Sequence, residues 1–98
     1  MTVIKDAERN EPRYLRQFAD VSGRRVLEIG CGDGRLTWRY AAAARTVAAI
    51  DIERDELRIA AIERPADLER RVGLSAASSI HLPFRNEAFD LAILAWSF

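Results

Sequence analysis

The sequence predicts an α/β domain with an open, mostly parallel sheet and flanking helices. Three observations lead to this fold class. Short apolar runs rich in β-branched residues alternate with longer segments of helical periodicity. The first apolar run ends in a glycine-rich turn, and the second ends in an aspartate. Strands that alternate with helices pair in parallel through right-handed crossovers, which is the geometry of an open α/β sheet.

The predicted elements follow from local patterns taken in chain order. Residues 1–23 are expected to form a leading segment with one helix, because residues 12–20 place apolar side chains at helical spacing. Alanine-rich composition favours the next helix, and Pro65 ends the one after it. Residues 24–98 are therefore expected to form a β-α-β-α-β-β core that ends after its fourth strand. Its predicted strands are residues 25–29, 46–50, 72–77 and 89–95, and its predicted helices are residues 36–45 and 53–64.

Composition and charge limit the classes of protein that fit. The chain has 98 residues, enough for one small domain, of which 49% are hydrophobic and 31% charged. Lys plus Arg equals Asp plus Glu at 15 each, so no overall field draws the chain to nucleic acid or to an anionic membrane. The first twenty residues are too charged for a signal peptide. A single cysteine excludes an internal disulfide and a cysteine-rich zinc site. We expect a cytoplasmic protein with no metal, nucleic-acid or membrane partner.

The turn after the first predicted strand reads Gly30-Cys31-Gly32-Asp33-Gly34. Glycines let the backbone adopt positive φ and approach a ligand without a Cβ in the way. In open α/β sheets the ligand lies beyond the carboxyl ends of the strands, where this turn is expected. The third glycine comes one residue earlier than in the G-x-G-x-x-G of dinucleotide binders, which argues against NAD. A Walker loop is excluded because no G-K-[ST] follows.

Asp51 ends the second predicted strand, 17 positions after Gly34. A carboxylate there can accept hydrogen bonds from the 2′ and 3′ hydroxyls of a ribose. It can also cap the helix expected from residue 53, and the two roles are compatible. The glycine turn and this acid together predict a ribose-bearing ligand.

Three motifs in order resemble those of the class I S-adenosylmethionine (SAM) dependent methyltransferases. VLEIGCGDG is similar to their first motif, with an acidic residue two positions before the first glycine. VAAID is similar to the strand that ends in their ribose-binding acid, and LPFRNEAFDLAILAWSF resembles the segment leading into their fourth strand. The resemblance extends over residues 12–98. It is strongest to the small-molecule branch described as methyltransferase domain type 11, related to enzymes of ubiquinone and menaquinone biosynthesis.

The resemblance implies a Rossmann-like fold, SAM as cofactor, and methyl transfer to a small-molecule acceptor that the sequence does not identify. It implies no particular catalytic residue. The cofactor contacts that it implies are Glu28 toward the amino end of SAM, Gly30, Gly32 and Gly34 along the methionine part, Asp51 at the ribose, Ile52 against the adenine, and Ala95 with Trp96 bordering the methionine end. Where relatives often carry an Asp-Ala pair near the adenine, this chain has Ser78 and Ser79, which bring no charge.

Other interpretations of several residues stay open. Glu28 can pair with a nearby arginine instead of facing a ligand. Cys31 is better explained as a small filler between glycines than as a nucleophile, because the sole histidine, His81, lies in a distant loop. Trp96 and Phe98 suit core or interface aromatics better than a substrate cage.

The end of the predicted core leads to a further expectation. With the strand order of the family, LAILAW would form an exposed edge that is prone to pairing. We therefore expect a fragment of a longer enzyme, incomplete for turnover, or self-association through the fourth strand, or a second chain that supplies the rest. The alternative function is a non-catalytic Rossmann-like module that binds a nucleotide or a partner.

Overall fold

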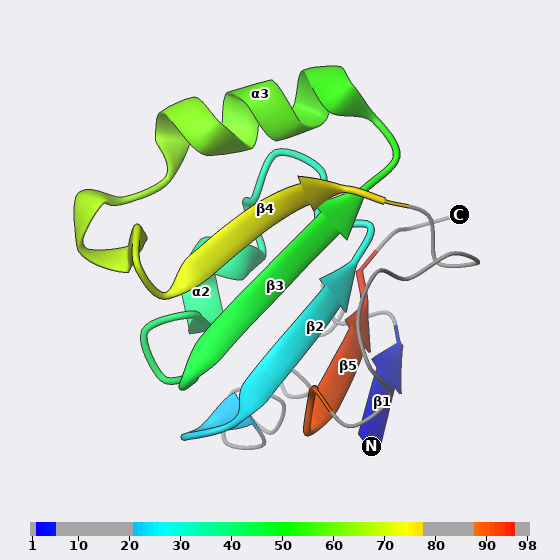
Figure 1. Cartoon of the computed structure of the whole chain (residues 1–98), viewed down its shortest axis with the longest axis vertical. Coiled ribbons are helices and arrows are strands. Elements are labelled where there is room, and N and C mark those ends of the chain that lie inside the picture. The colour runs from blue at the N-terminus through cyan, green and yellow to red at the C-terminus, as the bar shows by residue number, and fades with distance from the viewer. Residues whose placement is uncertain (1, 6–20, 78–87, 96–98) are drawn as a thin grey trace.

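A single parallel sheet organises the protein. The computed structural model describes residues 2–5, 21–77 and 88–95. Its strands are β1 (Thr2–Lys5), β2 (Arg25–Ile29), β3 (Thr46–Asp51), β4 (Val72–Ala76) and β5 (Leu91–Leu94), in the order β1-β5-β2-β3-β4. Every adjacent pair is parallel, and Figure 1 shows the arrows pointing the same way. The predicted open parallel α/β sheet is confirmed.

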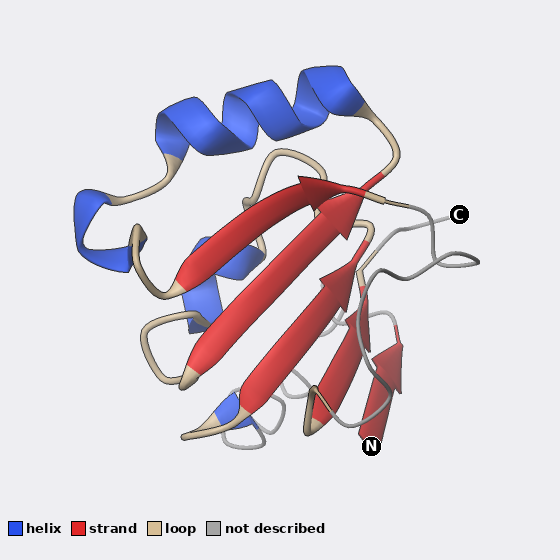
Figure 2. Ribbon diagram, in the orientation of Figure 1, coloured by secondary structure: helices blue, strands red, loops and turns tan. Residues whose placement is uncertain are grey.

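Helices connect the three strands from β2 to β4. They are α2 (Thr37–Tyr40) and α3 (Arg54–Glu63), the latter followed by a short 3₁₀ helix, η1 (Ala66–Leu68). Two successive right-handed crossovers in the same direction place α2 and α3 on one face of the sheet. Figure 2 shows α2 behind the strands and α3 along the β4 side. Among the described residues, none of the helices has the length and apolar character that a membrane span requires.

The core lies between the sheet and these helices. Strand register aligns Leu91, Val26, Val47 and Val72 in one row, and the side chains of such a row point to the same face. All four are at most 3% exposed, and the ring of Tyr40 from α2 is buried in the same cluster. Each such burial contributes about 1.5–3 kcal/mol of transfer free energy. This row therefore holds α2 against β2 and β3.

The first connecting helix is shorter than predicted. The sequence predicted a helix over residues 36–45, whereas α2 ends at Tyr40. The N–H of Ala43 bonds to the carbonyl of Tyr40 at 3.0 Å, which is the tighter pattern of a closing turn. The Arg71 guanidinium then takes the carbonyls of Ala42 and Ala44. Tertiary hydrogen bonds thus overrode the helix propensity of the alanine run.

The strand β1 corrects two expectations. Residues 2–5 were expected in a leading helical segment, and LAILAW was expected as an exposed edge. Instead β1 pairs with β5, with Thr2 beside Leu91 and Lys5 beside Leu94, so β5 lies between β1 and β2. A strand of four residues whose partner is almost ninety residues away leaves no local signal in the sequence. Because β5 is not an edge strand, the structure gives no support for self-association through it.

The other predicted elements agree closely with the structure. The strand over residues 25–29 is confirmed in full, and the remaining three strands and α3 differ from their predicted bounds by one or two residues at an end. Pro65 follows α3 as predicted. The helix predicted over residues 12–20 lies outside the described residues.

Candidate functional site

The glycine turn and Asp51 lie next to each other at the carboxyl edge of the sheet. Ile29 pairs with Ile50 in register, so Gly30 and Asp51, the residues that follow them, leave the sheet side by side. The backbone N–H groups of Gly30 and Cys31 both donate to the carbonyl of Ile50, at 2.9 and 3.0 Å. These two hydrogen bonds tie the start of the turn to β3.

The three glycines of the turn share a positive φ but face different surroundings. Their φ values are 81° at Gly30, 57° at Gly32 and 89° at Gly34, which side-chain-bearing residues rarely adopt. A Cβ at Gly32 would meet nothing within 4 Å. A Cβ at Gly34 would lie 2.3 Å from Cζ2 of Trp38. Gly32 therefore borders open space, whereas Gly34 is required by the packing of an indole ring.

The carboxylate of Asp51 links the turn to the start of α3. Its Oδ2 accepts a hydrogen bond from the N–H of Gly32 at 2.8 Å, and its Oδ1 accepts one from the N–H of Glu53 at 2.8 Å. The cap residue of α3 is Glu53, which makes no side-chain capping bond, so Asp51 orders the residue before the helix and does not cap the helix itself. An ionised carboxylate offers about four lone-pair sites, so about two remain on this half-buried group. Asp51 can hold the turn and still accept from a ligand.

Glu28 does not reach the surface of the site. Its side chain is 0% exposed, and Oε1 accepts hydrogen bonds from Thr37 Oγ1 at 2.8 Å and from the Tyr40 hydroxyl at 2.5 Å. Burial, together with the nearby carboxylate, raises the pKa of Tyr40 well above its usual value. Glu28 therefore anchors α2 to β2 from inside the core. Its contact with the amino end of SAM stays a prediction.

Three residues beside the turn were not predicted from the sequence. Thr37 and Tyr40 carried a usable signal, because hydroxyl side chains three positions apart share a helix face and the preceding strand holds a lone carboxylate. Trp38 carried no signal, because its contact with Gly34 depends on how the turn folds.

The buried thiol of Cys31 fits the filler interpretation. The residue is 6% exposed, and its Sγ–H donates to the carbonyl of Gly32 at 3.7 Å. Desolvation raises the pKa of the thiol far above its usual value, and the charges of Glu28 and Asp51 add to this effect. A thiol that stays protonated is a poor nucleophile.

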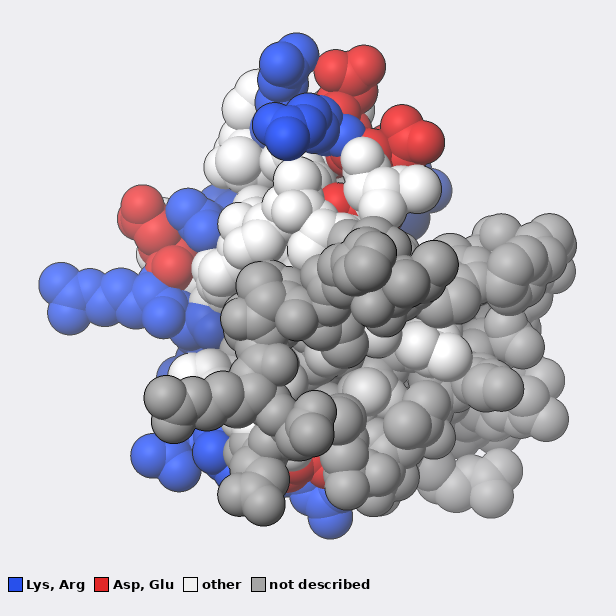
Figure 3. Space-filling model, turned by 45° about the vertical axis from the view of Figure 1, so that its right-hand side comes forward, with Lys and Arg blue, Asp and Glu red and all other residues white. Residues whose placement is uncertain are grey.

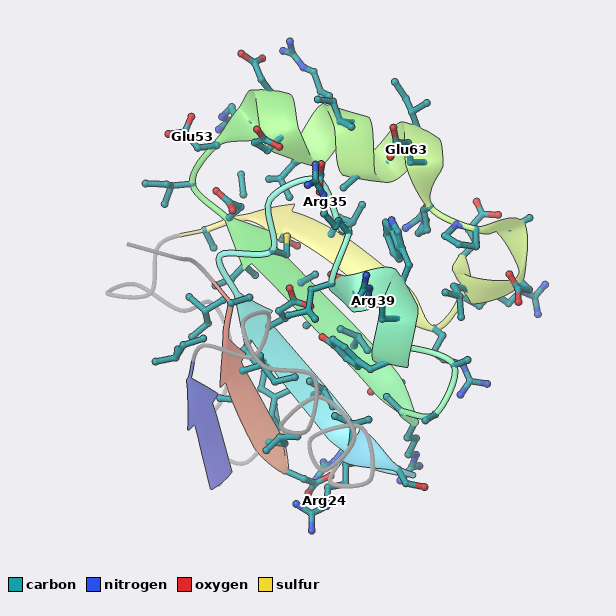
Figure 4. The ribbon with its side chains drawn as sticks, turned by 180° about the vertical axis from the view of Figure 1, so that it is seen from behind. Arg24, Arg35, Arg39, Glu53 and Glu63 are labelled. Carbon is teal, nitrogen blue, oxygen red and sulfur yellow. The ribbon has the colours of Figure 1, made fainter. Side chains whose placement is uncertain are left out.

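The polar side chains on the outer part of the turn pair locally. The guanidinium of Arg35 contacts Asp33 at 2.9 Å, and its backbone N–H donates to the same carboxylate at 3.1 Å. Figure 4 shows Arg35 on the loop that carries the turn, on the side of α3. Because the Arg35 side chain is 84% exposed, this pair contributes little to stability. Asp33 is thus a residue of the turn itself.

The remaining predicted residues fall into two groups. Ile52 follows Asp51 directly and is 69% exposed, so its apolar side chain can contact a ligand. Ala95 donates its N–H to the carbonyl of Ile29 at 2.9 Å, which brings the end of β5 beside the end of β2. Five residues named in the sequence analysis lie outside the described part of the chain: Ser78, Ser79, His81, Trp96 and Phe98.

Comparison with known proteins identifies the family. The family model described as a methyltransferase domain matches residues 26–98. Methyltransferase GfsG of Streptomyces halstedii is 32% identical over 90 residues, which are 89% of this chain and 32% of that protein. The crystal structure of a SAM-dependent methyltransferase from Mesorhizobium loti superposes with a TM-score of 0.65 at 27% identity, covering 81% of this chain and 36% of that one. The [4+2]-cyclase SpnF superposes with a TM-score of 0.68 at 30% identity, covering 82% and 32%.

The chain belongs to the class I SAM-dependent methyltransferase family, as its three motifs indicated. SAM is the cofactor of that family. The chain spans about a third of the length of these relatives.

Proposed function

We propose that this chain is the cofactor-binding portion of a SAM-dependent methyltransferase with a small-molecule acceptor. The observation that carries the proposal is the 2.8 Å contact between Asp51 Oδ2 and the N–H of Gly32. It places the Asp51 carboxylate, which can accept hydrogen bonds from ribose hydroxyls, next to the glycine turn, whose backbone a ligand can approach closely. The small-molecule acceptor is supported by the branch of the family that the three motifs resemble.

The residues present fit SAM in three respects. Asp51 keeps acceptor capacity after holding two backbone N–H groups. Gly32 borders open space that a Cβ would fill. Ile52 offers an exposed apolar side chain next to the acid, suited to cover a purine ring. When bound, SAM supplies a methyl group already activated by its sulfonium, so the protein chiefly has to align an acceptor and exclude water.

The proposal divides the predicted site residues by role. Asp51 holds the ribose, Ile52 contacts the adenine, and Gly30, Gly32 and Ala95 border the methionine part. The contacts of Gly34 with the methionine part and of Glu28 with the amino end of SAM stay predictions, and each residue also has a structural role. Gly34 makes room for Trp38, and Glu28 fixes α2 through Thr37 and Tyr40. Ser78 and Ser79 stay predicted residues of the adenine side.

The cytoplasmic location and the absence of nucleic-acid and membrane partners stay predictions. They rest on the single cysteine and the equal numbers of acidic and basic residues.

Calorimetric titration of the folded chain with SAM, S-adenosylhomocysteine and NAD tests the proposal. We expect binding heat with both sulfur ligands and none with NAD, because the third glycine comes too early for the dinucleotide pattern. Far-UV circular dichroism of the same sample verifies folding. A folded chain that binds neither sulfur ligand would leave the non-catalytic module as the better description. Methyl transfer needs its own assay, since one structural neighbour is a [4+2]-cyclase.

A further inference from the structure

The strand β4 forms one end of the sheet in the part of the chain that the structure describes. The carbonyl of Arg71 and the N–H of Ala77 both bond to β3, at 2.9 and 3.0 Å. In a parallel ladder, alternate residues of a strand bond to the same neighbour. Leu74 and Ala76 therefore direct their backbone N–H and C=O groups away from β3. This row of groups is a template on which another extended chain can pair.

A groove of about 310 Å³ runs between this edge and α3. The helix contributes Arg54, Leu57, Arg58 and Ala61, which recur at the spacing of a single helix face. Leu57 and Leu74 both line the groove with apolar surface, and both are partly buried against the hydrophobic core. Among the described residues, the charged side chains that line the groove are the two arginines.

The acidic side chains of α3 are not among the residues that line the groove. The charges of Glu56 and Glu63 make small contributions to the raised pKa of Arg35, which follows the glycine turn and does not line the groove. Asp55 contacts Arg58 at 3.3 Å, but both side chains are more than three-quarters exposed, so this pair is weak. Figure 3 shows the basic and acidic side chains gathered over α3 at the top of the molecule. The groove itself keeps a positive lining.

The spacing of the two arginines matches an extended peptide. Arg54 and Arg58 are four residues apart on the helix, a rise of about 6 Å. Alternate residues of an extended chain are about 6.6 Å apart and point to the same face. We propose that the groove binds an extended peptide segment with glutamates at alternate positions, which adds to β4 as a further strand. The glutamate methylenes cover Leu57 and Leu74 while the carboxylates reach the arginines.

Charge disfavours a second copy of this chain as the occupant. Two β4 edges related by a two-fold axis would pair in antiparallel fashion with both α3 helices on the same side. Arg54 and Arg58 of each copy would then meet at one seam, where like charges repel. An acidic peptide, by contrast, would be attracted to these arginines.

Fluorescence anisotropy with labelled peptides tests the proposal. The probe is Thr-Glu-Thr-Glu-Thr, with Thr-Gln-Thr-Gln-Thr as the uncharged control and Thr-Thr-Glu-Glu-Thr as the control with equal charge and broken spacing. We expect the probe to bind the folded chain about 2- to 30-fold more tightly than the uncharged control, because it forms two exposed ion pairs that the control lacks, and also more tightly than the broken-spacing control. Equal affinity of the probe and the broken-spacing control would overturn the proposal.

Backbone pairing is tested separately from charge. In a strand added to β4, alternate peptide N–H groups face the edge and the others face away. Two probes are therefore N-methylated, one at both glutamates and the other at the second and third threonines. We expect one of them to lose binding and the other to keep it. If both bind as the unmodified probe does, β-strand addition is wrong.

Variants of the chain complete the test with a matched control. Arg54→Gln with Arg58→Gln is expected to weaken binding of the probe about 2- to 30-fold, since both ion pairs are lost. Arg24→Gln with Arg45→Gln makes the same change of charge at exposed positions at the amino ends of β2 and β3, and it is expected to leave binding unchanged. Equal weakening by both pairs would show only attraction to net charge, and would overturn the groove assignment.

Discussion

Asp90 and Asp51 stand at opposite ends of the sheet in contrasting environments. At the amino end, Asp90 accepts three N–H groups of Arg25, from the backbone at 2.9 Å, from Nε at 3.1 Å and from Nη2 at 2.9 Å. The guanidinium holds the pKa of Asp90 well below its usual range. At the carboxyl end, Asp51 accepts the backbone N–H groups of Gly32 and Glu53. Within the described residues no cation pairs with Asp51.

The difference shows what makes a carboxylate structural or available. Asp90 directs its charge to one arginine, and the bond from its N–H to the Arg25 carbonyl, at 2.8 Å, closes β5 onto β2. Asp51 uses two lone pairs to hold the turn and keeps about two for a ligand. At the amino end of the sheet the carboxylate is therefore occupied by an ion pair. At the carboxyl end, backbone hydrogen bonds orient the carboxylate and leave it able to accept from a ligand.

The strongest change is expected within the carboxyl end, where one glycine is structural. Gly34→Ala combines a φ of 89° with a Cβ 2.3 Å from Trp38, so we expect the free energy of unfolding to fall by about 2–4 kcal/mol. Gly32→Ala carries strain alone, at a φ of 57° with nothing within 4 Å, and is expected to lose about 1–2 kcal/mol. Urea unfolding measures both losses, provided that the dependence of the free energy of unfolding on urea concentration is the same for each variant.

A double variant identifies the cause. Gly34→Ala combined with Trp38→Ala should lose less stability than the two single variants together, because the clash is absent. Equal losses from Gly34→Ala and Gly32→Ala would mean that the indole does not fix this position.

The two aspartates are expected to differ in their effect on SAM affinity. Asp51→Ala should weaken SAM binding by about 1.5–3 kcal/mol, or about 10- to 150-fold, because hydrogen bonds to a charged acceptor are lost. Asp90→Ala should lower the free energy of unfolding and leave SAM affinity unchanged. Calorimetry and urea unfolding of both variants measure this contrast. Equal loss of SAM affinity from the two would remove the distinction between the ends.

The buried carboxylate of Glu28 predicts an effect at a position between the two ends. Tyr40→Phe keeps the ring and removes one hydrogen bond to a buried charge, so we expect a loss of about 1.5–3 kcal/mol in stability. Thr46→Val, which removes an exposed hydroxyl, should change stability by less than about 0.5 kcal/mol. Urea midpoints compare the two. A neutral Tyr40→Phe would show that Glu28 does not depend on this donor.

The pH dependence of the Arg25–Asp90 pair is expected to be the weakest signal, because both side chains are 41% exposed. The pKa of Asp90 is lowered by folding, so its stabilisation is complete above the unfolded value of about 3.9 and is lost as pH falls below it. The stability difference between the wild type and Asp90→Asn should therefore shrink from pH 7 to pH 3. A constant difference across this range would exclude the ion pair as its source.

Local sequence was sufficient for the elements whose burial leaves a pattern. The strand over residues 25–29 and the acid that ends β3 were predicted because strands covered on both faces select short apolar, β-branched runs. The positive φ values of the turn were also predicted, because glycine lacks a Cβ and adopts them readily.

Contacts between distant residues required the tertiary structure. The pairing of β1 with β5 and the alanine carbonyls taken by Arg71 depend on partners that no window of sequence contains. The same holds for the buried position of Glu28, because its hydrogen bonds depend on how β2 and α2 pack against each other. The chemical properties of single residues could therefore be predicted from the sequence. Only the packing of their neighbours decided which glycine borders open space and which aspartate has no cationic partner among the described residues.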